Sequence, residues 1–231
     1  MALIHLAPED VDIPMIADLG SFRDWALSGE FPERGRIDWL AGRIEVDMSP
    51  EDVTSHGTVK NAQAHELTTQ VEHTGRGFVV TDRTRYTSPS ADLSCEPDVL
   101  VVLFESIEAG RVRLVPKATG EAGRYVEISG TADLVAEVVS DSSEEKDTKR
   151  LRKLYYQAGV PEYWLTDVRG GKVRFSILVR GPRAYSESPA SSDGWVWSPL
   201  LAKRVRLVRL PAQLGIDRFR VETRPGRPGR S

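Results

Sequence analysis

The chain has 231 residues, of which 40% are hydrophobic and 28% charged, the composition of a globular protein with one large domain. Its 31 Lys and Arg residues and 34 Asp and Glu residues give a net charge of −3, which argues against a nucleic-acid coat protein but leaves room for a local basic patch. The single cysteine, Cys95, excludes an internal disulfide scaffold and zinc-knuckle chemistry. No apolar run approaches the ~20 residues of a membrane helix, and the acidic N-terminus does not resemble a signal peptide. We therefore expect a cytoplasmic protein with no membrane partner.

The first third of the chain predicts two helices, a hairpin and a strand. A short helix is expected over 21–29, with Ser21 as its N-cap. Alternating apolar and polar residues over 37–46 predict a hairpin. Apolar residues at helical spacing over 56–72 predict a second helix, and 78–82 is typical of a strand.

Two near-continuous apolar runs, 97–104 and 132–140, predict strands buried on both faces. Between them, 111–115 and 124–129 are expected to form a hairpin. These segments indicate a sheet at the centre of the molecule.

The segment SDSSEEKDTKRLRKLYYQAGVP, residues 140–161, predicts a well-defined helix. Ser142 followed by Glu145 is a capping-box pattern, and Gly159 is expected to end the helix. Its core face is formed by Leu151, Leu154, Tyr155 and Ala158.

After this helix, 162–168 and 172–181 predict two more strands, and we expect a parallel pairing across the helix. The order of elements indicates a single α/β domain with a mixed sheet of about six strands flanked by helices. We divide the chain into an N-terminal extension (1–19), a folded domain (20–215) and a basic tail (216–231) that is expected to be disordered.

Two carboxylates are notable for their place in apolar strands. Asp98 opens one buried strand, and Glu137 lies inside the other. Because an ionised carboxylate is costly to bury alone, Glu137 should face a cation, a metal ion or a hydrogen-bond network. Two acids that converge from neighbouring strands make an oxygen-rich site suited to Mg²⁺ or Mn²⁺. The alternative is that Glu137 pairs with a buried arginine or lysine and has no further role.

Asp147 falls about 40° from Leu151 on the helical wheel and should therefore face the core. Alternatively, Asp147 complements the helix dipole in the first turn. The other side of the wheel carries Lys146, Lys149, Arg150 and Lys153. This basic stripe is either a solvated face or a surface that follows a phosphate backbone.

His56, at the expected start of the second helix, is a candidate general base or metal ligand, or simply a capping residue. The sequence contains no GxSxG, P-loop, GxGxxG or HExxH motif. The common signatures of hydrolases, ATPases and dinucleotide-binding proteins are therefore missing.

Three runs of sequence carry a resemblance to a known family: EPDVLVV (96–102), ADLVAEVVSDSSEEKDT (132–148) and LYYQAGVPEYWLTDVRG (154–170). They resemble the Uma-two family of restriction endonucleases, also known as domain of unknown function eight-twenty, a branch of the PD-(D/E)XK nuclease superfamily. The hairpin that ends in Met-Ser-Pro (48–50), followed by His56, is similar as well. The resemblance covers about 20–182 and implies a restriction-endonuclease-like fold.

The family resemblance implies that Asp98 and Glu137 hold the metal ion. It also implies hydrolysis of a phosphodiester bond, in which Mg²⁺ or Mn²⁺ activates a water molecule. The position of a third acid in the family is Arg43 here, so Glu45 or Asp47 would have to replace it. These two acids, together with His56 and Asp147, are candidate auxiliary residues.

The lysine of the superfamily pattern is also missing from its usual positions. Two residues after Glu137, where many nucleases have a lysine, this chain has Val139. Many members of the resembled family supply a lysine from the next helix, at the position that is Leu151 here. We therefore predict that Lys146 takes this role, although its wheel angle points away from the leucine face.

These observations predict a metal-dependent endonuclease that hydrolyses DNA, uses Mg²⁺ or Mn²⁺ and works as a homodimer. The alternative is a catalytically inactive protein of the same fold that binds nucleic acid or another partner. A metal hydrolase acting on another phosphate ester is a third hypothesis.

Overall fold

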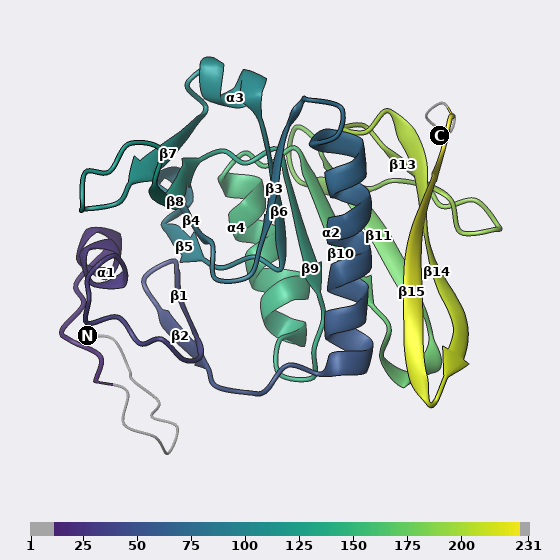
Figure 1. Cartoon of the computed structure of the whole chain (residues 1–231), viewed down its shortest axis with the longest axis horizontal. Helices are drawn as coiled ribbons and strands as arrows, with labels where there is room; N and C mark the ends of the chain where they lie inside the picture. The colour runs from purple at the N-terminus through teal and green to yellow at the C-terminus, as the bar shows by residue number, and fades with distance from the viewer. Residues whose placement is uncertain (1–11, 227–231) are drawn as a thin grey trace.

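The computed structural model describes residues 12–226, which form three sheets with helices beside and between them (Figure 1). The central sheet has the strand order β12-β11-β10-β9-β6-β3. Its strands are β3 (Gly77–Thr81), β6 (Val99–Leu103), β9 (Leu134–Val138), β10 (Glu162–Asp167), β11 (Arg174–Arg180) and β12 (Tyr185–Glu187). β9 and β10 run parallel and the other neighbours antiparallel, so the sheet is mixed.

The two apolar strands lie in the middle of this sheet, as predicted. Every residue of β6 and β9 is buried, because neighbouring elements cover both faces. The parallel pairing of β9 with β10 requires a crossover, which η3 (Lys146–Leu151) and α4 (Arg152–Gln157) supply. The helix ends at Gly159, whose φ of +84° is in the left-handed region that favours glycine. The predicted parallel pairing is confirmed.

The capping box predicted at the start of this helix does not form. Ser142 donates instead to the carboxylate of Asp47, at 3.1 Å. The turn is held by Ser143, whose hydroxyl accepts from the backbone N–H of Ser140 at 2.9 Å. The local sequence pattern was therefore overridden by a contact between segments far apart in the chain.

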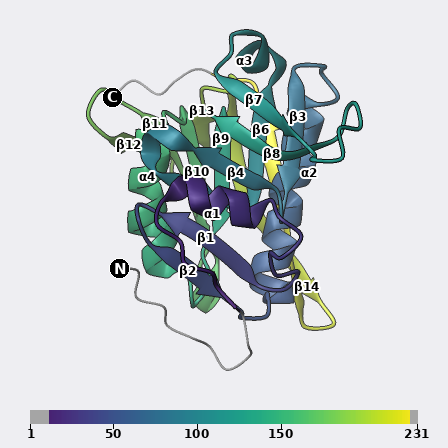
Figure 2. The same ribbon diagram turned by 90° about the vertical axis from the view of Figure 1, so that its left-hand side faces the viewer.

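A second sheet has the order β2-β1-β5-β4-β8-β7. Its strands are β1 (Arg36–Leu40), β2 (Ile44–Asp47), β4 (Arg85–Ser88), β5 (Leu93–Cys95), β7 (Val112–Pro116) and β8 (Tyr125–Gly130). Helix α1 (Leu19–Ala26) lies in front of β1 in Figure 2 and buries Phe22 and Trp25 against this sheet. The N-cap of α1 is Asp18, and Ser21 is its capping-box partner at N3 rather than the cap itself.

The third sheet consists of β13 (Val196–Ser198), β14 (Lys203–Gln213) and β15 (Ile216–Arg224). The prediction of disorder from residue 216 is wrong for 216–224, which pair with β14 and bury Phe219 and Val221 in a core shared with α2 (Thr58–Val71). The high content of arginine concealed the alternation that makes this segment a strand. The last part of the predicted tail, 227–231, and residues 1–11 of the predicted extension lie outside the described residues.

The predicted class, an α/β protein with a mixed sheet flanked by helices, is confirmed, but residues 12–226 form three sheets instead of one. The remaining short elements are η1 (Val53–Gly57), η2 (Pro89–Ala91), α3 (Phe104–Glu108) and η4 (Arg169–Gly171). Within residues 12–226, no helix has the length and apolar character to cross a membrane.

Candidate active site

Asp98 and Glu137 meet at one edge of the central sheet. β6 begins where β9 ends, and the register of Val99 with Ala136 places the two acids side by side. The backbone N–H of Asp98 donates to Glu137 Oε2 at 3.2 Å, and the N–H of Val138 donates to Asp98 Oδ2 at 2.8 Å. Both side chains are 1% exposed. The convergence expected from the two apolar strands is therefore present.

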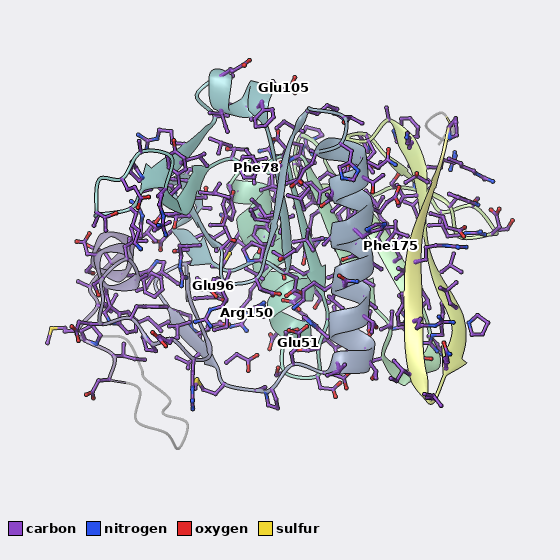
Figure 3. The ribbon with its side chains drawn as sticks, viewed as in Figure 1. Glu51, Phe78, Glu96, Glu105, Arg150 and Phe175 are labelled. Carbon is purple, nitrogen blue, oxygen red and sulfur yellow. The ribbon has the colours of Figure 1, made fainter. Side chains whose placement is uncertain are left out.

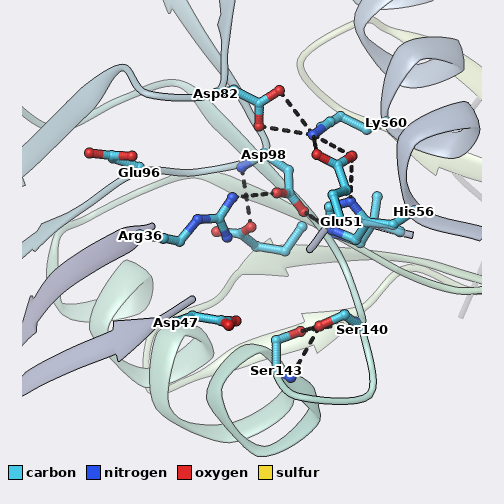
Figure 4. A network of polar contacts seen from close by, with 12 residues as sticks. Arg36, Asp47, Glu51, His56, Lys60, Asp82, Glu96, Asp98, Ser140 and Ser143 are labelled. Carbon is cyan, nitrogen blue, oxygen red and sulfur yellow. Dashed lines mark hydrogen bonds and ion pairs between the residues drawn. The ribbon is translucent and has the colours of Figure 1, made fainter. Parts of the chain in front are cut away.

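Two cationic side chains contact the carboxylate of Asp98 (Figure 4). Arg36, at the start of β1, donates from Nη2 to Oδ1 at 2.8 Å. His56, on η1, lies with Nε2 3.1 Å from Oδ2. Burial by itself would raise the pKa of Asp98, but the His56 hydrogen bond and the charge of Arg36 outweigh it and hold this pKa well below its usual range. Asp98 is therefore ionised at neutral pH.

The pKa of Glu137 is shifted in the opposite direction to that of Asp98. The Tyr155 hydroxyl donates to its Oε1 at 2.6 Å. Burial, together with the negative charges of Asp98 and Asp147, raises the pKa of Glu137 well above its usual range. Glu137 therefore takes up a proton more readily than its neighbour Asp98. Among the described residues, the arginine at this site bonds to Asp98, and Glu137 itself bonds to a backbone N–H and a tyrosine.

His56 bridges Asp98 and a second acid, Glu51, whose Oε1 is 3.0 Å from Nδ1. Burial would lower the pKa of His56, but the two carboxylates outweigh it and raise this pKa to about 9. The imidazole is therefore charged at neutral pH. Lys60, on α2, extends this chain of ion pairs, because its Nζ lies 2.6 Å from Glu51 and 2.9 Å from Asp82.

Lys146 lies inside the protein, in contrast to the side expected from the helical wheel. Its side chain is 7% exposed, and Nζ is 3.5 Å from Asp38 Oδ2. The reason is that η3 is a π-helix, in which residues i and i+5 are one turn apart, so Lys146 and Leu151 face the same way. Burial would lower the pKa of Lys146, but the charge of Asp38 outweighs it and raises this pKa.

Asp147 is buried, as its place on the wheel predicted. The Ser143 hydroxyl donates to its Oδ2, and the Tyr163 hydroxyl donates to its backbone carbonyl at 3.0 Å. Its Oδ1 has no hydrogen-bond partner among the described residues. Burial raises the pKa of Asp147 to about 6.

The other auxiliary candidates lie at the margin of the site. Glu45 forms an ion pair with Arg150 on η3, and Asp47 accepts from Ser142. The sequence reasoning did not identify Arg36, Asp38, Glu51, Lys60 or Tyr155. Asp38 carried a usable signal, because it is a charged residue that lies between the apolar residues Ile37 and Trp39 in β1.

A cleft of about 490 Å³ opens beside these groups. Arg36 and His56 line it and also touch Asp98, so they separate the buried carboxylates from the cleft. The lining also includes Glu51 and Glu96, which are labelled in Figure 3, and the Ser140–Ser143 turn. The cleft therefore has both cationic and acidic walls.

Asp98 and Glu137 supply carboxylate oxygens, which are the type of ligand atom that a hard divalent cation prefers. Within residues 12–226, no group of three or more His, Cys, Asp and Glu side chains is arranged to hold a metal ion. Mg²⁺, however, usually keeps several waters and is bound by one or two carboxylates together with substrate phosphates. Asp98 and Glu137 supply the two carboxylates, and a bound ion would reach the cleft only if the Arg36 and His56 side chains that lie between moved aside.

The mixed sheet and the acidic pair at its edge define a restriction-endonuclease-like α/β protein. A similar solved structure is titled a "putative nuclease belonging to DUF820" from Anabaena variabilis, with a TM-score of 0.60 and 16% sequence identity over 81% of this chain and 92% of the other. The family model "Uma2: Putative restriction endonuclease" matches residues 20–210, and the chain belongs to this family. The family resemblance seen in the sequence is thereby confirmed, and it supports a nuclease function. No curated protein matches the chain.

Proposed function

We propose that this protein is a metal-dependent endonuclease that hydrolyses DNA phosphodiester bonds in the cleft beside Asp98 and Glu137. The observation that carries this proposal is the meeting of the two buried carboxylates, Asp98 and Glu137, at the edge of the sheet. The ammonium group of Lys146 is buried as well and pairs with Asp38 on β1. Membership of a family described as restriction endonucleases supports the reaction class. The ion would be Mg²⁺ or Mn²⁺, since oxygen donors suit both.

Asp98 and Glu137 would hold the cation, which when bound supplies an activated water molecule and stabilises charge on the phosphate. Glu137 must be ionised for this role, which its raised pKa disfavours, whereas the lowered pKa of Asp98 favours its ionised form. Lys146 is protonated at neutral pH because its pKa is raised. Its Nζ would therefore serve as a hydrogen-bond donor to the substrate phosphate rather than as a base. Arg36 and His56, both charged and both lining the cleft, would bind the phosphate.

The substrate we propose is duplex DNA, with two copies of the chain needed to cut both strands. Each chain has one carboxylate pair beside one cleft, which would act on one strand at a time. A C₂ dimer would present two clefts related by the symmetry that the two strands share. Cytoplasmic action agrees with Cys95, which is a buried free thiol.

The alternative function is an inactive protein of this fold that binds nucleic acid. One observation favours it: both carboxylate oxygens of Asp98 already have cationic partners, Arg36 and His56. If these cations permanently replace the metal ion, the cleft binds phosphate without cleaving it. Mn²⁺ binding to the purified protein separates the two functions, because an active site takes up the ion and loses it in Asp98→Ala.

The experiment is plasmid nicking with Mn²⁺ by the wild-type protein, Glu137→Ala, Lys146→Ala and Lys149→Ala. Lys149 is the matched control, since its side chain lies on the same π-helical turn but is 75% exposed. We expect wild type and Lys149→Ala to nick the plasmid, and the other two variants to lose roughly 100-fold or more of the rate. Cleavage by Glu137→Ala would place the chemistry elsewhere or reveal a contaminant. Absence of cleavage and of Mn²⁺ binding in all four proteins would favour the inactive alternative.

A further inference from the structure

The β14–β15 hairpin has two faces of different character. Successive residues of a strand point to opposite faces. The inward face is apolar and buried, and it consists of Val205, Leu207, Phe219 and Val221. The register of the outward positions pairs Arg204 with Arg224, Arg206 with Glu222, Val208 with Arg220 and Leu210 with Arg218. The outer face therefore carries five arginines and one glutamate.

These arginines exceed the acids available to them. Arg206 and Arg220 share Glu222, at 2.7 and 2.5 Å, and Arg224 lies 3.9 Å from Asp193. Apart from Arg204, four guanidinium groups and two carboxylates leave an excess of two positive charges on this face, whereas the whole chain has a net charge of −3. The Arg220 and Arg224 side chains are 61% and 46% exposed. The face is thus a local basic patch on an acidic protein.

An aromatic side chain holds part of this patch in place. The guanidinium groups of Arg206 and Arg224 lie over the Trp195 ring, at 4.6 and 4.2 Å from its centroid. Trp195 is 6% exposed and therefore fixed by packing. Stacking on a buried ring reduces the rotational freedom of both arginines, which lowers the entropy lost when they bind a ligand.

The hairpin also lies close to the candidate active site. β15 packs along α2 and contacts η1, the turn that carries His56. Figure 1 shows the tip of the hairpin at the lower end of α2, where the chain enters from η1. At this end Val53 of η1 and Leu214 of the hairpin are 73% and 96% exposed. The outer face is turned away from α2, because the inward face packs on that helix, and the Arg204–Arg224 pair lies at the end of the hairpin opposite the tip.

We infer that the outer face of the β14–β15 hairpin is a docking surface for the phosphate backbone of duplex DNA. The inference rests on the proposed function and names the part of the molecule that holds the substrate outside the cleft. The patch extends over about 20 Å from Arg204 to Leu210, given a rise of about 3.3 Å per residue, so it reaches several phosphates. Guanidinium groups suit this ligand because their paired N–H donors match phosphate oxygens.

The test is the salt dependence of duplex binding in EDTA, so that cleavage plays no part. The full-length protein is titrated into a fluorescent 30-base-pair duplex between 50 and 250 mM salt. Arg220→Ser/Arg224→Ser is compared with Arg113→Ser/Arg183→Ser, which removes the same charge from exposed positions on other elements. We expect the first pair to bind about 10-fold more weakly and to lower the slope of log K against log salt by about 2, and the second pair to resemble wild type. Thermal unfolding of each variant verifies the fold.

Equal slopes in the two double variants would overturn the inference, as would equally tight binding of poly-glutamate or of an anionic vesicle. The outcome does not depend on the proposed reaction. If the wild type binds DNA through these arginines but fails to nick it, the docking surface stands and the catalytic proposal falls. If the wild type nicks DNA while both double variants bind alike, the reverse holds.

Discussion

His56 makes the stability of the metal-free protein dependent on pH. In the unfolded chain the pKa of His56 is 6.5. In the folded protein Asp98 and Glu51 raise this pKa to about 9, against the opposing effect of burial. Because the folded state binds this proton more tightly, the stabilisation is complete below pH 6.5 and is lost as the pH rises through 9. We expect a loss of at most about 3 kcal/mol across this range. Urea unfolding in EDTA at pH 6, 7.5 and 9.5 measures it.

His56→Gln should lack this component of the pH dependence. His65→Gln, which changes an exposed histidine on α2, is the control and should behave as the wild type does. The same decline in all three proteins would show that another group is responsible.

The sequence identified the carboxylates of the site but not their partners. Asp98 and Glu137 were predictable because a carboxylate in an apolar strand is costly to bury unless it has a specific partner or role. Arg36 and Tyr155 were not, since they reach these acids across 62 and 18 residues of chain, and only the tertiary fold decides which charged or hydroxyl groups meet.

Among the secondary elements, the two π-helical turns are where sequence reasoning failed most clearly. A period of 3.6 residues correctly predicted the buried face of Leu154 and Tyr155 on α4. The same period placed Lys146 on the solvent side, because a local pattern does not reveal a switch to i→i+5 hydrogen bonding. His56 also lies on a π-helical turn, η1. Both turns direct a cation toward the acidic cluster at the edge of the sheet.

Glu162 joins two elements of the fold and offers a test at this scale. It lies at the start of β10, is 1% exposed, and accepts from Trp164 Nε1 and Ser198 Oγ at 2.6 Å and from the Leu200 N–H at 2.9 Å. Glu162→Gln replaces one accepting oxygen with an NH₂ donor, so at least one of these donors loses its partner. We expect the free energy of unfolding to fall by about 1–3 kcal/mol in urea denaturation.

Glu187→Gln on β12 is the matched control for this substitution, because Glu187 is exposed and accepts from Ser176 at the surface. Its effect should stay within about 0.5 kcal/mol. Equal stability of the two variants would mean that the hydrogen bonds from Glu162 to β13 and to the segment after it do not stabilise the fold.

At the scale of the whole molecule, the class of fold was predictable and the division into sheets was not. Strands that are buried on both faces need other elements packed on each side of their sheet, and the helix that ends at Gly159 is one such element. These two features together predict an α/β protein. The second sheet depends on pairings between distant segments, such as β1 with β5 and β4 with β8. Composition was also misleading at residues 216–224, where six polar residues concealed the inward pair Phe219 and Val221.

The corrected end of the domain leads to a prediction about truncation. A chain that ends at Gly215, the boundary indicated by the sequence, lacks β15 and leaves the edge of β14 and one side of α2 uncovered. Removal of Phe219 and Val221 from the core should lower the free energy of unfolding by about 3 kcal/mol or more. Val221→Asp should reproduce much of this loss by placing a charge in the same interface. Arg220→Ser, on the outer face of the same strand, should change stability by less than about 0.5 kcal/mol. Urea denaturation followed by circular dichroism compares the four proteins, and an unchanged unfolding curve for the truncated chain would show that β15 contributes nothing to the fold.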